Sequence, residues 1–591
     1  MDRPDFLKKL ELDALPAVRR PSRYAGGEWG MVKKDWGSCG LRMALAFPEA
    51  YEIGMSNTGF LILYHLINDL PDTLCERVFA PWVDMEEKLR ECGLPIFSLE
   101  SRRPLSDFDV LGFSLSYELT FSNVLTILSL AGIPFRAKDR GENYPLVIAG
   151  GCSTCNPEPV AEIFDAMLVG EGEEAVVEML SAVRSAKENK KPKSDLLKEL
   201  AEVEGVYVPS LLDDEGYQKQ VKRRFVKELD SAYYPAACIL PDMQAIHDRV
   251  NLEILRGCAR GCRFCQAGVI YRPRRERSPE TLAATAKALC AATGYEEISL
   301  LSLNSADYSK LPELLKELDS FATPRRISIS LPSTRLDAFS DEIAKSVRAV
   351  RPTGLTFAPE AGTQRLRDVV KKDITEDEIR EGIMAGIRSG ARRVKLYFMI
   401  GLPTETEEDV LAIAGLVGRL RKEIRKEAGG RVRVSVSVSN FVPKPHTPFQ
   451  WFHMERADSL RGKQRLLWQN IRWKDVELRL HDIDTGYIEA IFSRGDRRLL
   501  PVLEAAWELG ARFDGWTERF SLERWREAFE RCGPSVGCGS SVDCGPSVGC
   551  GLDPDEFAYR KFAPGDALPW SHISIGVTEK YLLKEFEESR K

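Results

Sequence analysis

The sequence lacks a strong excess of either charge. Its 591 residues include 83 Lys and Arg against 89 Asp and Glu, a net charge of -6. This balance disfavours a strongly basic nucleic-acid-binding protein, although it leaves room for a local basic groove. Long apolar runs are also missing: stretches such as 394–402 are strand-length or broken by Lys, so no transmembrane helix is expected. Residues 1–20 are charged and have no apolar signal-peptide core, which favours a cytoplasmic protein.

The remaining composition is typical of a globular chain, with 43% apolar and 29% charged residues. At about 150 residues per domain, the length suggests about four domains, or fewer if one is a barrel. The chain has 14 cysteines. In a cytoplasmic protein these are better explained as metal ligands, catalytic groups or buried thiols than as disulfides.

Strand and helix patterns alternate along most of the chain and predict an α/β protein. Residues 1–40 are polar and Gly-rich, which predicts an extended lead-in. Residues 41–225 predict a doubly wound parallel domain, and 226–248 a linker. In 249–455, six strand-like segments alternate with five helical ones, the pattern of a partial or full α/β barrel. Residues 456–591 are Trp- and Arg-rich and predict a helical extension.

Two cysteine groups have several interpretations. The segment CGPSVGCG occurs at 532–539 and again at 544–551, and its low complexity predicts a flexible insertion over 532–551. Its even C-x5-C spacing matches no usual zinc pattern. Cys152 and Cys155 form a C-x2-C pair, which suits a redox pair, an auxiliary metal site or, preferably, two buried or loop thiols.

The sharpest signal is the loop LRGCARGCRFCQAG at 255–268. Cys258, Cys262 and Cys265 give C-x3-C-x2-C at the end of the first strand of the second domain. Three thiolates from one tight loop can hold three irons of a cubane cluster, which leaves the fourth iron open to a small chelating molecule. Phe264 is positioned to shield such a cluster from water. A zinc knuckle would need a fourth Cys or His nearby, and none follows.

This loop resembles the signature of the radical SAM superfamily, C-x3-C-x-aromatic-C at the first strand of a partial (β/α)6, TIM-like barrel. The resemblance implies a [4Fe-4S] cluster on Cys258, Cys262 and Cys265. It also implies S-adenosylmethionine (SAM) bound to the open iron and cleaved reductively to start radical chemistry, with methylation or methylthiolation among the outcomes. No residue is assigned a catalytic role on the substrate.

The ends of the later strands offer polar groups where SAM would need them, although each also suits a helix cap or a barrel-rim ion pair. We expect the methionine amino group, the carboxylate, the ribose and the adenine to be bound there. The candidates are Ser302 and Asn304 for the amino group; Ser333 and Arg335 for carboxylate or ribose; Glu360, paired with Arg365, for ribose or ammonium; and Gly401, Pro403 and Val442 beside the adenine.

The region before the barrel resembles the Rossmann-like cobalamin-binding domain that precedes many radical SAM barrels. The similarity rests on the segment 147–174, in which Gly150 and Gly151 would let a flat ligand approach a strand end. The D-x-H-x-x-G cobalt-ligand motif is absent, and His65 lies on an apolar helix. Two readings stay open: the domain binds cobalamin without that histidine, or it has lost the cofactor.

Substrate and partners are less defined. The basic stretch 271–279 is either a face for an anionic substrate, such as RNA or a ribosome-associated target, or a solvated turn. The resemblance also implies an electron donor such as flavodoxin or ferredoxin, and no membrane partner is expected. The alternatives are a non-catalytic iron–sulfur or zinc protein that binds RNA or ribosomes, and a cobalamin-dependent methyltransferase.

Nearly the whole chain also looks like one uncharacterised radical SAM family, which supplies no substrate. The segments that carry this similarity are 51–60, 76–82, 156–159, 358–369, 442–451, 493–498 and 568–573.

Overall fold

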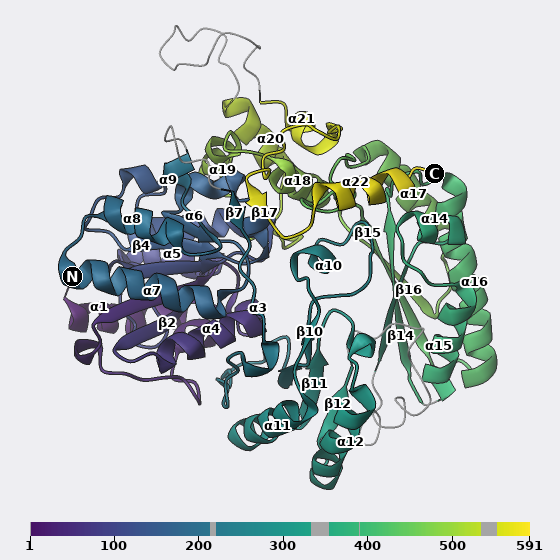
Figure 1. Cartoon of the computed structure of the whole chain (residues 1–591), viewed down its shortest axis with the longest axis horizontal. Helices are drawn as coiled ribbons and strands as arrows, with labels where there is room; N and C mark the ends of the chain where they lie inside the picture. Colours follow the sequence, from purple (N-terminus) through teal and green to yellow (C-terminus); the bar gives the residue numbers. More distant parts are fainter. Residues whose placement is uncertain (1, 213–219, 332–353, 389, 533–551) are drawn as a thin grey trace, which may run out of the picture.

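The computed structural model describes residues 2–212, 220–331, 354–388, 390–532 and 552–591. Its first part is a six-stranded sheet with the order β2–β1–β3–β4–β5–β6 (Figure 1). Pairing is parallel except for β6, which is antiparallel to β5. The strands are β1 (Leu41–Phe47), β2 (Thr73–Phe79), β3 (Val110–Ser114), β4 (Leu146–Gly150), β5 (Ala166–Leu168) and β6 (Val206–Tyr207).

Both faces of this sheet are covered, as the continuous burial of its strands requires. Alternate strand residues contribute to two different cores: Met43 and Leu45 pack with helices α4 (Thr58–Asp69) and α7 (Gly172–Asn189), whereas Ala44 and Ala46 pack with the opposite layer. That layer includes α5 (Val83–Cys92) and α6 (Phe121–Ala131). The predicted doubly wound α/β fold is confirmed, although β2 was not anticipated.

The extended lead-in predicted for residues 1–40 is wrong. Helix α1 (Arg3–Lys9) begins at Asp2, whose carboxylate accepts from the Asp5 N–H, and helical turns continue to Ala17. Phe6 and Leu10 are buried against the N-terminal sheet layer. The polar composition of the segment hid this narrow apolar stripe, which tertiary packing stabilises.

The barrel region consists of two parallel sheets. One contains β8 (Val250–Glu253), β11 (Glu297–Leu301) and β12 (Ser328–Ser330); the other contains β13 (Leu355–Glu360), β14 (Arg393–Ile400), β15 (Arg433–Asn440) and β16 (Val476–Leu480). Helices alternate with these strands, including α11 (Pro279–Thr293), α12 (Leu311–Ala322), α15 (Glu376–Arg388), α16 (Glu407–Ala428) and α17 (Ala457–Asn470). Strand–helix alternation of the expected radical-SAM-like type is therefore present.

The predicted helical extension from residue 456 also contains strands. The segment Val476–Leu480 forms β16, which pairs in parallel with β15 and adds a seventh strand to the two barrel sheets in the described ranges. The strand is only five residues long and its side chains are partly or fully exposed. Its sequence pattern is therefore weak, and its pairing with β15 decides its conformation.

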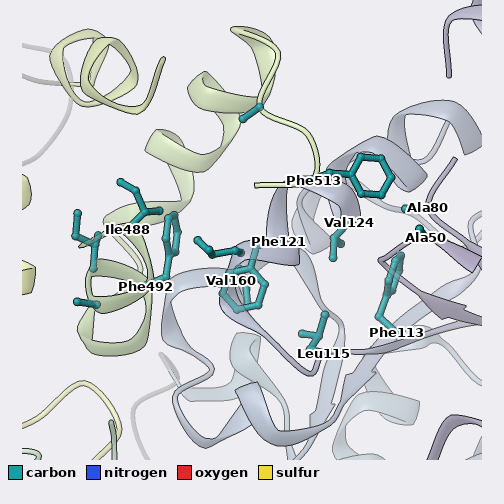
Figure 2. Close-up of a cluster of buried hydrophobic side chains, with 14 of the residues drawn as sticks. Ala50, Ala80, Phe113, Leu115, Phe121, Val124, Val160, Ile488, Phe492 and Phe513 are labelled. Carbon is teal, nitrogen blue, oxygen red and sulfur yellow. The ribbon is translucent and has the colours of Figure 1, made fainter. Parts of the chain in front are cut away.

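The remaining C-terminal helices pack back onto the N-terminal sheet layer. They include α18 (Ile483–Arg494), α19 (Leu499–Glu508) and α20 (Leu522–Arg531). Figure 2 shows Phe492 of α18 beside Phe121 of α6, with ring centroids 5.9 Å apart. This shared core joins the two ends of the chain, so the C-terminal extension is part of the scaffold.

No helix in the described ranges is long and apolar enough to cross a membrane.

Candidate functional site

The cysteine loop follows β8 and the short strand β9 (Leu255–Arg256), which pairs with β10 (Arg275–Glu276). Cys258, Cys262 and Cys265 are partly buried. The loop begins at Gly257, where φ is +90° and an added Cβ would lie 2.5 Å from the Tyr271 carbonyl oxygen. Only glycine fits this backbone position without strain. The sequence therefore turns sharply at the point where the thiols begin.

The donor set of this loop fits an iron–sulfur cluster. The Gly268 N–H donates to Cys265 Sγ at 3.2 Å, the kind of hydrogen bond that tunes cluster sulfurs. Burial raises the pKa of Cys265 to about 11, and the neighbouring Cys262 and Cys258 thiols add to that shift. In the described ranges, no three His, Cys, Asp or Glu side chains are already arranged as a metal site, so the fit rests on donor chemistry and spacing.

Phe264, expected to shield the cluster, packs instead against a small core that contains Leu366, Val370 and Phe449. Its ring is partly buried. A shielding role for Phe264 therefore stays a prediction.

The segment after β11 is tied to the cysteine loop, because Arg260 pairs with Asp307 at 2.8 Å. Within this segment, Ser302 Oγ lies 2.8 Å from Ser305 Oγ. The Asn304 residue is 3% exposed, yet neither its amide nitrogen nor its amide oxygen has a hydrogen-bond partner. An unpaired buried polar group costs about 1–3 kcal/mol. A ligand bearing both an ammonium and a carboxylate would satisfy both amide atoms.

Two of the other expected SAM contacts, Ser333 and Arg335, lie outside the described residues. The expected pairing of Glu360 with Arg365 is wrong. Glu360 pairs with Lys372 at 2.9 Å. Arg365 pairs with Asp409 and also donates to Thr404.

The reason for these partners is local. Helix α14 (Gln364–Val369) begins at the Thr363 cap, and Arg365 in its first turn reaches Asp409 at the start of α16. Glu360, at the end of β13, has a φ of +66°, a strained value for a residue with a side chain. Its charge also acts on Cys265. The strained Glu360 therefore lies within electrostatic range of the cysteine loop.

The expected adenine contacts lie on the barrel rim. The Gly401 N–H, at a residue with φ of +80°, donates to Glu405 Oε2 at 2.6 Å. Pro403 is buried, and Val442 is partly buried against the main core. These positions neither establish nor contradict adenine binding, so the three assignments remain predictions.

A cavity of about 630 Å3 lies between the N-terminal sheet and the first barrel strands. It opens at the carboxyl ends of β1 and β3, where the strand order reverses and doubly wound sheets bind ligands. Sequence reasoning anticipated only Gly150, Gly151 and Ser302 in its wall. Other lining residues are Met43, Leu45, Ile62, Leu63, Phe113, Leu168, Val176 and Met179 from the N-terminal part, and Glu253, Arg256, Gly257, Tyr271 and Ser299 from the barrel part.

The cavity has an apolar channel and a polar mouth. The channel runs between the sheet face and helices α4 and α7, whereas the mouth reaches Gly257, the first residue of the cysteine loop. At Gly150 an added Cβ would make an ordinary contact with Leu168, 3.8 Å away, so the strand end is not tightly covered there. This shape suits a flat ligand with an apolar appendage.

Two histidines lie near this cavity. His65 is buried, and burial lowers its pKa to about 4. His247 lines the cavity mouth, with its Nδ1 3.2 Å from an Arg249 guanidinium nitrogen. Because Arg can only donate, Nδ1 is the acceptor and the proton of the neutral ring sits on Nε2. His247 was not anticipated from sequence.

The basic stretch 271–279 is not uniformly exposed: Arg274 is exposed, but two of its other arginines are buried. Arg275 and Arg277 are 8% and 3% exposed. Arg275 pairs with Glu171 at 2.7 Å, and Arg277 lies 3.5 Å from Glu253. Buried arginines need such partners. The stretch therefore holds the N-terminal sheet and the cysteine-bearing strand together.

Cys152 lines the cavity and its Sγ donates to the Ser116 carbonyl oxygen at 3.1 Å, whereas Cys155 is buried. Burial raises the pKa of Cys152 to about 11 and that of Cys155 further. A redox-active pair requires a lowered thiol pKa. The interpretation as loop and buried thiols is therefore the better one.

The repeat 532–551 lies, apart from Cys532, outside the described residues.

Comparison with family models gives two matches. Residues 59–209 match the model described as "Radical SAM proteins, N-terminal", and residues 252–417 match the "Radical SAM superfamily" model. An uncharacterized protein of Methanocaldococcus jannaschii is 31% identical over 466 residues, which cover 78% of this chain and 90% of that protein.

Two further relatives carry named activities. A tRNA-2-methylthio-N(6)-dimethylallyladenosine synthase of Thermoanaerobacter pseudethanolicus is 26% identical over 259 residues, which cover 42% of this chain and 53% of that protein. The solved structure of the radical S-adenosylmethionine methyltransferase TsrM from Kitasatospora setae, with cobalamin and a [4Fe-4S] cluster bound, has a TM-score of 0.53 at 14% identity. That match covers 83% of this chain and 99% of TsrM, and it shows a shared fold.

Proposed function

Because this chain belongs to the radical SAM superfamily, we propose that Cys258, Cys262 and Cys265 hold the [4Fe-4S] cluster on which its chemistry depends. The chain is an enzyme that uses a [4Fe-4S] cluster and SAM, and not the non-catalytic alternative. When bound, the cluster supplies one electron that cleaves SAM and starts radical chemistry. Three thiols on one loop, at the spacing C-x3-C-x2-C, support this assignment.

The chain's own residues would then bind and orient SAM. We assign Asn304 to the amino-acid end of SAM, because both of its buried amide atoms lack partners. Ser302, Ser333, Arg335, Glu360, Arg365, Gly401, Pro403 and Val442 are further proposed contacts, and Phe264 is a proposed shield. The strained Glu360 at the end of β13 is the strongest of these, because backbone strain tends to persist where function requires it.

The decisive experiment uses the full chain, reconstituted anaerobically with iron and sulfide. SAM and dithionite are added, and 5'-deoxyadenosine is measured by chromatography. Its appearance, together with iron and sulfide in the protein, is the expected result. A protein that takes up zinc without sulfide, or that holds the cluster at three other cysteines, would contradict the proposal.

Replacing Asn304 by Leu should weaken SAM binding at least tenfold, about 1.4 kcal/mol. The same change should leave the SAM-free protein equally or more stable, because it removes two unpaired buried polar atoms. Calorimetric titration with SAM and thermal unfolding measure the two effects. Asn470→Leu, at an exposed position on α17, is the control. Unchanged SAM affinity, or destabilisation of the SAM-free protein, would show that Asn304 is structural.

The cavity at the switch point supports a second cofactor, and we propose a corrinoid there. Its apolar channel suits a macrocycle with an appended base, and its mouth meets the cysteine loop. A corrinoid at this place would carry a methyl group, which makes methylation the proposed outcome. The protein would bind it without a histidine ligand, since the arrangement of His247 leaves Nε2 protonated.

Methylthiolation is the second candidate, favoured by the similarity of part of the chain to a tRNA methylthiolating synthase.

Radical SAM enzymes need a reductant and a substrate. We propose flavodoxin or ferredoxin as the reductant. Because these donors work in the cytoplasm, we also propose a cytoplasmic location. RNA or a ribosome-associated target is the first substrate to test. The buried, paired state of Arg275 and Arg277 means that the RNA proposal rests on the relative and not on the basic stretch.

A further inference from the structure

The last helix of the chain, α22 (Glu579–Glu588), lies against the cysteine loop. Figure 1 shows it crossing above the short helix α10 (Ala267–Ile270), which directly follows that loop. The Arg272 guanidinium lies 5.6 Å from the centre of the Tyr581 ring of α22. The contact joins residues about 300 positions apart in the sequence, and no sequence motif indicated it.

The centre of this contact is the carboxylate of Glu585. It is 3% exposed and accepts from two cations at once: Arg263 Nε at 3.0 Å on one oxygen and Lys371 Nζ at 2.5 Å on the other. Glu588, one turn later on α22, lies 3.3 Å from Arg263 but is 38% exposed. Glu585 is therefore the buried member of the pair and the one that bridges both cations.

Both cations touch the loop on either side of Cys262. Arg263 is the next residue, and its backbone N–H donates to the Val370 carbonyl at 3.0 Å while its guanidinium donates to Val369 at 2.8 Å. Lys371 lies against Gly261, where an added Cβ would be 3.5 Å from Nζ. Two positive charges thus flank one proposed cluster ligand, and a single carboxylate from α22 bridges them and offsets part of their charge.

We propose that Glu585 is a positioning residue for the cluster: it locks the cysteine loop through Arg263 and Lys371 and sets the cluster's reduction potential. This rests on the proposed assignment of the cluster to the three cysteines. Reduction adds an electron to the cluster, so nearby uncompensated cations favour the reduced state and a nearby carboxylate opposes it. The partial burial of this site limits solvent screening.

The test compares variants of the reconstituted full chain by redox titration followed by electron paramagnetic resonance. Glu585→Gln removes the carboxylate that bridges both cations and should shift the midpoint potential upward. Lys371→Gln removes one cation and should shift it downward. The double variant should return towards the wild-type value. Glu588→Gln, at the exposed neighbour, should shift the potential least. A second readout is iron loss to an added chelator, expected to be several-fold faster in Glu585→Gln because the loop is no longer locked.

Equal potentials in all variants, or shifts of the same sign for Glu585→Gln and Lys371→Gln, would overturn this inference while the cluster assignment stands. A wild-type protein that takes up no iron and sulfide would instead refute the proposed function. If Glu585→Gln fails to fold, Lys371→Gln decides alone: its lysine is 33% exposed, and its potential must fall.

Discussion

Replacing Cys262 by Ala should abolish both the cluster absorbance and all reductive cleavage of SAM. Cys262 is the central thiol of the loop and contributes to the electrostatic environment of Cys265. With two thiols left, the loop has too few donors for a cubane cluster, which needs three protein ligands when the fourth iron is kept for a substrate. We therefore expect loss to background, and not a graded decrease.

The measurements are iron and sulfide content, the visible spectrum after reconstitution, and 5'-deoxyadenosine production. Cys290→Ala is the matched control, because Cys290 is a buried thiol on α11 that packs in the core of the first barrel sheet. That variant should keep the cluster and the activity. A Cys262→Ala protein that still cleaved SAM would show that the cluster is held elsewhere.

Replacing Leu63 by Trp should prevent corrinoid binding while sparing the cluster. Leu63 lines the apolar channel on α4, and an added Cβ at Gly172 of α7 would lie 3.1 Å from its side chain, so the two helices meet closely there. The larger indole ring at position 63 would therefore extend into the open channel. The ring would then occupy the volume that an appended base needs.

We expect at least a tenfold loss of cobalamin affinity, about 1.4 kcal/mol or more. The readout is cobalamin retained after gel filtration, measured by its visible spectrum, alongside the iron content. Leu61→Trp, on the same helix but outside the cavity lining, should bind cobalamin as the wild type does. Wild-type protein that retains no cobalamin would refute the corrinoid proposal itself, and equal retention by both Trp variants would place the ligand elsewhere.

Several parts of the fold could be predicted because their signals are local. The alternation of buried strands with amphipathic helices predicts a parallel α/β protein, since each pattern follows from the 2.0 or 3.6 residue period of one element. The spacing of Cys258, Cys262 and Cys265 is equally local. Where local signals were weak, the predictions failed: α1 has a narrow apolar stripe in a polar segment, and β16 is short and mostly unburied.

The site residues divide in the same way. Asn304 could be named from its place after a strand, but its lack of partners depends on how the barrel packs around it. Arg365 was assigned to the wrong carboxylate because sequence proximity suggested Glu360, whereas the folded chain brings Asp409 nearer. Arg275 looked like part of an exposed basic face until its partner Glu171, 104 positions away, was located.

By itself, the sequence determined the chemical class of this protein, because the cluster-binding loop is one contiguous segment whose donors and glycines are all close in the chain. Only the tertiary structure decided which cavity adjoins that loop and what surrounds its charges. The Arg263–Glu585 contact, between residues 322 positions apart, is such a case. Burial and charge neutralisation arise when distant segments meet, and no spacing along the chain records which of them will do so.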